Sequence, residues 1–284
     1  MKTNAIVRIV CYSLVALLLI AILLAGLGVG QLTFHFGNSG GEPINGELRV
    51  DAADVQNIEI EWVSGDITLS VATDGSQQIL IRESGASGDQ REATWEIRGQ
   101  TLVIRDAEPG FTLGFTSTQD KDLTVTFPAG WFCNDLDIET VSGSVEISVL
   151  SASRIEVEGV SAQCRFSGCT AKDVSISTVS GNVTYLGDVD TLDCKSVSAS
   201  CEIFPDNLPR ELRLESVSGD LIVGLLEPAG FTTALDSVSG KVYSDFSTTS
   251  AHGNQTYGDG SCRIHADTVS GDIEIRRMEI RLTE

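Results

Sequence analysis

A short tripeptide recurs along this chain and limits the possible fold more than any other feature of the sequence. Val-Ser-Gly, or its variant Val-Ser-Ala, begins at Val63, Val141, Val160, Val179, Val197, Val217, Val238 and Val269. From Val141 onward the steps between copies are 19, 19, 18, 20, 21 and 31 residues. Repeats at such a period are the signature of a solenoid, in which one structural unit stacks on copies of itself.

The residues on either side of each tripeptide alternate between apolar and polar. Apolar residues stand five and three positions before the Val and four and six positions after it, as at Leu136, Ile138, Val145 and Ile147. A period of two is that of a β-strand with one buried face. The apolar positions change from odd to even offsets across the tripeptide, so the chain must turn a corner there. The sequence therefore predicts an all-β fold, a single-stranded, β-helix-like solenoid with coils of about 19 to 20 residues.

The three corner residues have separate expected roles. The third position is Gly in six copies and Ala in two. This favours crowding inside the corner over a left-handed backbone, which Ala would disfavour. We expect the Val to lie in the core, so that Val179→Asp would unfold much of the rod by burying a charge. We expect the Ser hydroxyls to form a hydrogen-bonded ladder from coil to coil. A catalytic Ser is disfavoured, because no His or Asp accompanies each copy.

Residues 1–30 have the pattern of an N-terminal membrane anchor. Ile9 to Val29 is an uncharged apolar run of 21 residues, and at about 1.5 Å per residue a helix of this length spans about 30 Å of hydrocarbon. Lys2 and Arg8 precede the run, and no positive charge follows it until Arg49. The positive-inside rule then predicts a single-pass protein of the cell membrane, with its C-terminal domain extracytoplasmic. A cleaved signal peptide is the alternative interpretation.

The rest of the chain divides into a spacer and one repeat domain. Residues 31–46 are rich in Gly, which predicts a flexible spacer. Residues 47–284 form the expected β-solenoid, with irregular coils over 47–130 and regular Val-Ser-Gly coils over 131–284. Within the longest step, Phe246 to Ser261 is polar and Gly-rich, which predicts a surface loop.

The chain is strongly acidic, with a formal net charge of -21, and the part beyond the apolar run carries -23. Nucleic acid is therefore disfavoured as a partner.

The position after the corner Gly or Ala varies from Asp66 to Gln163 and Lys241, which argues against a ladder of calcium ligands and predicts a solvated turn. A row of carboxylates is expected on the outward strand face: Glu59, Glu61, Asp137, Glu139, Glu156 and Glu158. A role in solubility explains this row better than weak binding of divalent cations does. Charge near the C-terminus is expected to discourage end-to-end stacking of the terminal strand, through Arg276, Arg277, Glu279 and Arg281.

The seven cysteines fall into three groups. Cys11 lies in the apolar run. Three others occupy apolar columns and are expected to be small buried hydrophobes: Cys164, Cys194 and Cys201. Outside these columns stand the candidates for disulfide pairing: Cys133, Cys169 and Cys262. No Cys-x-x-Cys occurs and the three His are scattered, so the sequence predicts no zinc site, and it offers no catalytic or cofactor-binding residue.

The pattern of recurring coils resembles a known family. Leu123 to Pro128, then Leu136 to Ile147 and the successive Val-Ser-Gly coils are similar to the bacterial β-strand-repeat family labelled "putative adhesin", a domain of unknown function. The resemblance covers residues 47–284. It implies a tether at the cell envelope and a role in adhesion, and it brings no active-site residues. The two Val-Ser-Ala corners and the Phe246 to Ser261 insertion depart from the family pattern.

Three functions are compatible with these observations. We favour a non-enzymatic, membrane-anchored, adhesin-like interaction module of the cell envelope, whose partner would be an envelope protein or a surface glycan. An envelope-stress sensor or regulator acting through a membrane partner is the alternative. A polysaccharide-active β-helix enzyme is less favoured, because no coil carries a distinct pair of carboxylates.

Overall fold

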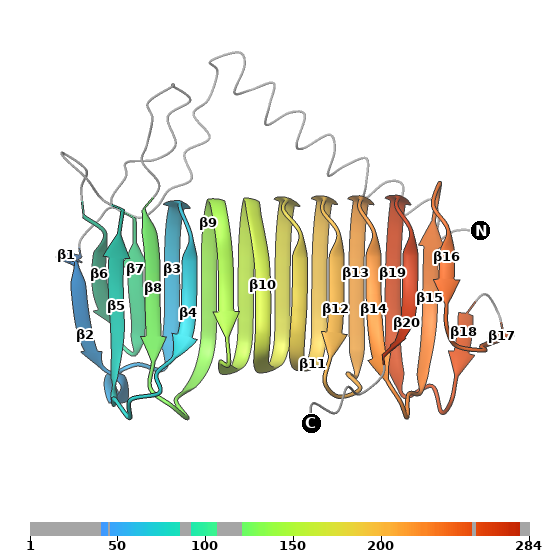
Figure 1. The fold of residues 1–284 in the computed structure, drawn as a ribbon, viewed down its shortest axis with the longest axis horizontal. Helices are drawn as coiled ribbons and strands as arrows, with labels where there is room; N and C mark the ends of the chain where they lie inside the picture. Colours follow the sequence, from blue (N-terminus) through green and yellow to red (C-terminus); the bar gives the residue numbers. More distant parts are fainter. Residues whose placement is uncertain (1–40, 45, 86–91, 107–120, 252–253, 279–284) are drawn as a thin grey trace, which may run out of the picture.

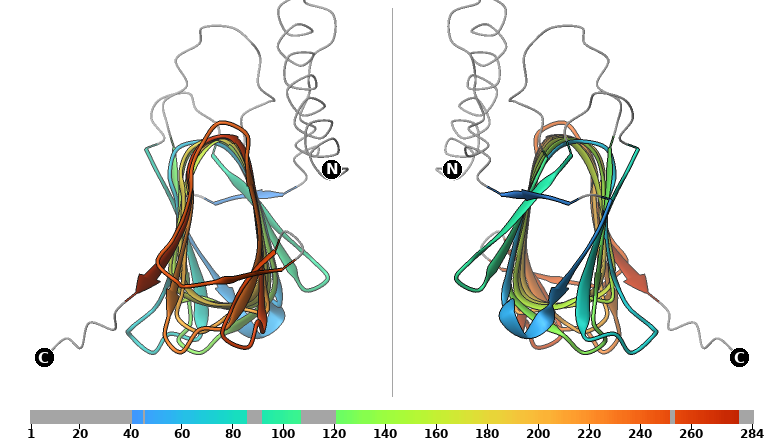
Figure 2. Two further views of the ribbon diagram at one scale, coloured as in Figure 1. Left: turned by 90° about the vertical axis from the view of Figure 1, so that its right-hand side faces the viewer. Right: turned by 90° about the vertical axis from the view of Figure 1, so that its left-hand side faces the viewer.

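A computed structural model describes residues 41–44, 46–85, 92–106, 121–251 and 254–278 as a flattened β-solenoid (Figures 1 and 2). Two sheets face each other along the rod, and the Val-Ser-Gly corners carry the chain from one sheet to the other. The prediction of an all-β, solenoid-like fold is confirmed. The expected anchor over residues 1–30 lies outside the described residues, and none of the described helical structure is long and apolar enough to cross a membrane.

The first sheet contains the strands that lead into each corner. Most of them are parallel, and at each end the last two strands are added by antiparallel pairing. In spatial order its strands are β1 (Glu42–Pro43), β6 (Thr94–Arg98), β7 (Thr101–Arg105), β3 (Asn57–Ser64), β9 (Phe132–Ser148), β10 (Ser151–Ser180), β11 (Val183–Ser198), β13 (Glu211–Ser218), β19 (Cys262–Ser270), β15 (Phe231–Ser237), β18 (Asn254–Tyr257) and β17 (Thr249–Ala251).

The second sheet contains the strands that leave each corner. The long strands β9, β10 and β11 pass through corners and so belong to both sheets. A short 3-10 helix, η1 (Ala52–Asp54), follows the outermost strand. In spatial order the strands are β2 (Glu47–Asp51), β5 (Gln78–Ser84), β8 (Asp122–Phe127), β4 (Ile67–Val71), β9, β10, β11, β12 (Cys201–Pro205), β14 (Leu221–Leu226), β20 (Ile273–Met278) and β16 (Val242–Ser244).

The order of the coils in space departs from the order of the chain at both ends. The coil of β3 and β4 lies between that of β7 and β8 and that of β9. Likewise, β19 and β20 lie between the coil of β13 and β14 and the coil of β15 and β16. The last coil of the sequence is therefore not the end of the rod. The expectation that Arg276 and Arg277 guard a terminal strand is wrong, because their strand β20 is flanked on both sides.

Most corner Val residues do not lie in the core, and Val63, at 9% exposure, is the buried exception. The apolar positions before and after them are buried in most coils, as predicted, although Val242 in the coil of β15 and β16 is exposed. By contrast, Val179 is only half-buried and Val238 is 53% exposed. Val and Ser both face outward at the bend, and the residue before Val faces inward instead. This position holds a hydroxyl in six coils. It is half-buried at Ser237 and buried at Thr140, Thr178, Ser196, Ser216 and Thr268.

The expected ladder of corner Ser hydroxyls is replaced by hydrogen bonds of this preceding residue. Thr178 Oγ1 donates to the Ser180 carbonyl at 3.0 Å, and Ser196 Oγ donates to Ser216 Oγ of the adjacent coil at 2.9 Å. Among the described corner serines, one hydroxyl pair is close, Ser161 with Ser180 at 3.2 Å. The inward position carries the bonds because a buried hydroxyl must find a partner, whereas an outward one meets water.

The corner Gly residues stand where neighbouring coils approach most closely. A Cβ on Gly143 would lie 2.0 Å from the Gly65 carbonyl oxygen, and one on Gly181 would lie 2.3 Å from that of Ala162. Crowding is therefore confirmed as a reason for Gly. Gly143 and Gly181 also have positive φ, of 126° and 118°, so the backbone adds a second reason in these coils.

The segment from Phe246 to Ser261 is not the surface loop that its composition predicts. Phe246 is 4% exposed and packs edge-on against Phe231, with ring centroids 5.1 Å apart. The strands β17 and β18 form a hairpin, and β18 pairs antiparallel with β15. The segment thus forms the C-terminal end of the first sheet. Its two aromatic residues, Phe246 and Tyr257, pack against each other and against Phe231 of β15, and this packing holds the polar segment on the rod.

Candidate functional site

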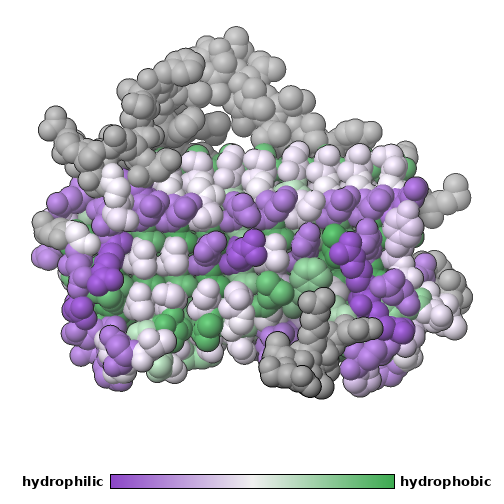
Figure 3. All heavy atoms as spheres, in the orientation of Figure 1, coloured by the Kyte–Doolittle hydropathy of each residue, from purple (hydrophilic) through white to green (hydrophobic). Residues whose placement is uncertain are grey.

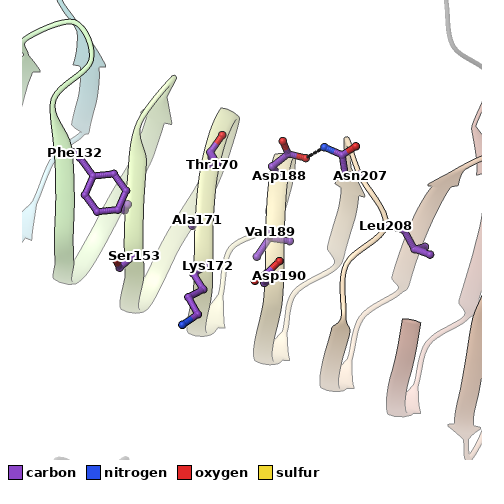
Figure 4. Close-up of a pocket in the computed structure, with 11 residues that line it drawn as sticks. Phe132, Ser153, Thr170, Ala171, Lys172, Asp188, Val189, Asp190, Asn207 and Leu208 are labelled. Carbon is purple, nitrogen blue, oxygen red and sulfur yellow. Dashed lines mark hydrogen bonds between the residues drawn. The ribbon is translucent and has the colours of Figure 1, made fainter. Parts of the chain in front are cut away.

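A shallow groove of about 490 Å³ runs across several coils where their first-sheet strands begin (Figure 4). Its residues come from β9, from β10 and β11, and from the segment between β12 and β13. Because adjacent strands are about 4.8 Å apart, the groove offers side chains at regular steps along the rod. It is lined by Phe132, Ala152, Ser153, Thr170, Ala171, Lys172, Asp188, Val189, Asp190, Asn207 and Leu208.

The groove combines apolar ends with a polar centre. Phe132 is 51% exposed at one end and Leu208 is 37% exposed at the other. Between them, Asn207 Nδ2 donates a 2.6 Å hydrogen bond to Asp188 Oδ1, which fixes the orientation of the amide. Lys172 supplies an exposed ammonium group. Sequence reasoning missed this site, because its residues lie outside the repeated columns; the one available signal was an aromatic residue, Phe132, at a strand start.

The predicted acidic track lies together on the outer face of the first sheet. Glu59, Asp137 and Glu156 are in register across three coils, and so are Glu61, Glu139 and Glu158. Partial burial and then the neighbouring carboxylates raise the pKa of Asp137 and Glu139. Burial raises the pKa of Glu61 in spite of Arg105. Within the described part of the chain, no group of three or more His, Cys, Asp or Glu is arranged to hold a metal ion.

Arg105 neutralises the N-terminal end of this acidic face. Its guanidinium lies 3.0 Å from Glu59, 2.9 Å from Glu61 and 2.7 Å from Glu96. A second basic side chain, Lys121, is buried nearby. Sequence analysis identified neither residue, since both stand in the irregular coils.

Lys121 is the centre of a buried ion cluster. Its ammonium group lies 2.5 Å from Asp106 and 3.2 Å from Glu83, and all three side chains are at most 3% exposed. Burial alone would lower the pKa of Lys121, but the two carboxylates outweigh burial and raise it. The ammonium group also lies 5.8 Å from the centre of the Trp62 ring. These contacts join β5, the end of β7 and the start of β8 to β3, which indicates a structural role.

The position after the corner Gly is not a simple solvated turn. In several coils its side chain accepts a hydrogen bond from the backbone N–H of the same position in the adjacent coil. Asp220 Oδ1 accepts from Asp272 N at 2.8 Å, and Asp272 Oδ1 accepts from Lys241 N at 2.8 Å. The same contact joins Asp122 to Asp66, Asp66 to Ser144, Asn182 to Ser200 and Ser200 to Asp220. Figure 3 shows a largely hydrophilic band that runs along the rod on the side facing the viewer. Lys241 lies in the last coil of the described rod, so no described coil beyond it needs an acceptor.

The six described cysteines are free thiols. The expected pairing candidates, Cys133, Cys169 and Cys262, are buried and unpaired, so no disulfide links them. Burial raises the pKa of Cys133 and Cys262 to about 12, which makes both thiols unreactive. The predicted burial of Cys164, Cys194 and Cys201 is confirmed.

Comparison with known proteins identifies relatives of this fold. The family model described as Toastrack DUF4097 matches residues 76–187 and 133–276. A structure titled as a putative adhesin from Bacteroides fragilis is 16% identical, with a TM-score of 0.49 over 82% of this chain and 96% of its own. A structure titled as a putative cell adhesion protein from Clostridium sporogenes is 10% identical, with a TM-score of 0.41 over 84% of this chain and 100% of its own. No curated protein matches the chain.

Proposed function

Because the chain belongs to the Toastrack family, DUF4097, we propose that it is an adhesin-like, non-enzymatic interaction module held outside the cytoplasm by a membrane anchor over residues 1–30. The observation that carries this proposal is the groove of Phe132 to Leu208, a binding surface that extends over several coils. The family resemblance and the adhesin names of similar structures support a surface role. The apolar run Ile9 to Val29 supports the anchor.

The chemistry of the groove favours a glycan over an envelope protein as the partner. An exposed aromatic ring such as Phe132 can stack on the C–H face of a sugar, and the Asn207 amide and the Asp188 and Asp190 carboxylates can bond its hydroxyls. Repetition along the rod suits a polymer with a repeating unit. The charge of -23 on the part of the chain after the apolar run repels acidic polymers, so the proposed ligand is an uncharged polysaccharide.

A binding assay with matched variants tests the site. The full chain in detergent micelles is incubated with insoluble cellulose, chitin and mannan, and the bound fraction is measured. We expect at least one polymer to bind, and Phe132→Ala and Leu208→Ala to weaken that binding about tenfold or more, as loss of a central apolar contact does. Leu186→Ala is the control, because Leu186 is also 37% exposed but lies outside the groove. Failure of all three polymers to bind would refute the glycan assignment.

Two further measurements test on which side of the membrane the rod lies and whether the protein cleaves a polysaccharide. Protease treatment of intact spheroplasts should digest residues 47–284 if the rod is extracytoplasmic, whereas protection until lysis would reverse the topology. Release of soluble sugar from a bound polysaccharide would identify an enzyme instead of a binding module.

A further inference from the structure

The strand β16 is an uncovered edge at the C-terminal end of the second sheet. It pairs with β20 on one side, and among the described residues no strand pairs with its other side (Figure 1). Lys241 O accepts from Ile273 N at 2.9 Å, and Asp245 N donates to Ile275 O at 3.0 Å, so these groups face β20. Backbone groups alternate in direction along a strand, and Val242 and Ser244 therefore direct their N–H and C=O groups away from the rod.

The same edge exposes apolar side chains. Val242 is 41% exposed and Tyr243 is 48% exposed, whereas Val145 and Val183, at the position equivalent to Val242, are fully buried. Val238, at the corner of this coil, is 53% exposed. At the other end of the same sheet the edge strand β2 carries the exposed charged residues Glu47 and Arg49, and the first sheet extends past this coil through β18 and β17. Natural proteins usually protect an edge strand, so an unprotected one is a candidate for pairing with another chain.

The sequence of this edge is complementary to itself. Residues 241–245 read Lys-Val-Tyr-Ser-Asp. Antiparallel pairing about a two-fold axis at Tyr243 places Lys241 opposite Asp245 of the second copy, and places the two Tyr243 rings opposite each other on the same face. Val242 then lies opposite Ser244 of the second copy, and these two residues exchange the backbone hydrogen bonds that face outward in the single chain.

We propose that β16 joins two copies of this chain through an antiparallel strand pair, giving a C2 dimer of rods that meet at their C-terminal ends. A two-fold axis makes the contact isologous, so each copy contributes both a Lys and an Asp. The charge pairing favours a second copy over an unrelated strand, because Lys241 and Asp245 flank the edge in the order that self-pairing requires. This inference is independent of the groove, which lies elsewhere on the rod.

Charge-swap variants test the pairing directly. The mass of the full chain in detergent micelles is measured by sedimentation equilibrium up to concentrations on the order of 100 µM, because a single short strand pair forms a weak interface. We expect the wild type to form a dimer. The single variants Lys241→Asp and Asp245→Lys should each raise the dimer dissociation constant at least tenfold, and the double variant should recover the dimer. Lys195→Asp is the control, because Lys195 is exposed on the first sheet and changes the net charge equally.

Cross-linking gives a second readout. The two Tyr243 residues would form a non-hydrogen-bonded pair with Cα atoms about 4.5 Å apart, close enough for a disulfide. Tyr243→Cys should therefore cross-link under mild oxidation, while Leu208→Cys, an exposed site away from the edge, should not. A wild type that stays monomeric, single charge variants that dimerise as well as the wild type, or equal cross-linking of both Cys variants would overturn the proposal.

Discussion

Ser196 Oγ donates a 2.9 Å hydrogen bond to Ser216 Oγ in the adjacent coil, and both side chains are buried just before a corner Val. This pair shows how the coils satisfy polar groups inside an apolar stack. Each hydroxyl also lies within hydrogen-bond distance of the Ala199 carbonyl oxygen, at 3.0 Å and 3.4 Å. The buried hydroxyls thus help to hold the backbone of the corner.

Removal of one of these hydroxyls should destabilise the rod. Ser196→Ala is expected to cost about 1 kcal/mol, because it removes a buried hydrogen bond and leaves Ser216 with fewer partners. Ser198→Ala is the matched control, since Ser198 is an exposed corner serine in the same coil. Unfolding in urea, followed by circular dichroism, compares the two variants. Equal midpoints would show that the inward position is no more important than the outward one.

The outward placement of the corner Val leads to a second prediction. Val179→Asp should be tolerated, with a loss of about 1 kcal/mol or less, because the side chain is half-buried and can reach water. Ile176→Asp should prevent folding, because Ile176 is fully buried and its site offers no partner for a charge. Thermal melts of both variants test this. If Val179→Asp also fails to fold, the corner is more enclosed than the structure indicates.

The ion cluster of Lys121 leads to a third prediction. Lys121→Met should cost about 3 to 5 kcal/mol, because it leaves Asp106 and Glu83 buried without their cation. Lys195→Met is the control: the exposed Lys195 pairs with Asp193 at 3.0 Å, and its removal should change stability by less than about 0.5 kcal/mol. Urea unfolding at pH 7 measures both. A small effect at Lys121 would mean that the carboxylates accept a proton or other partners instead.

The acidic face leads to a prediction of pH dependence. The pKa values of Asp137 and Glu139 are raised in the folded chain, so their ionised forms destabilise it at pH 7. Lowering the pH through the folded pKa values should relieve this cost, until the unfolded chain also takes up protons. The double variant Asp137→Asn, Glu139→Gln should therefore melt at a higher temperature than the wild type at pH 7. The difference should shrink toward pH 5, and a difference that grows instead would contradict the assigned shifts.

Val149 leads to a prediction of increased stability. This residue has φ of 59°, in the left-handed region that a β-branched side chain rarely adopts, and it is 64% exposed. Val149→Gly should stabilise the rod by about 1 kcal/mol, because relief of backbone strain exceeds the added entropy of the unfolded chain. Val238→Gly is the control, since Val238 is similarly exposed without a positive φ. Thermal melts should move in opposite directions for the two variants.

The candidate groove shows the limit of sequence reasoning about function. Its polar and apolar residues come from the starts of separate coils, where the repeat specifies neither size nor charge. Phe132, Asp188 and Asn207 come to line one groove only when the coils stack. The acidic track was predictable because its residues follow the strand period, and its members are in register in the structure.

The sequence by itself determined the all-β coil, its period and the faces of its strands, because these follow from local alternation of apolar and polar residues. The tertiary structure decided which coil packs on which. Ile264 is in register with both Leu212 and Thr233, so the last coil of the chain is inserted between two earlier ones. The columns of different coils are chemically alike, and only contacts between distant segments distinguish one stacking order from another. The same contacts leave β16 at the end of the second sheet and place most of the corner Val side chains outside the core.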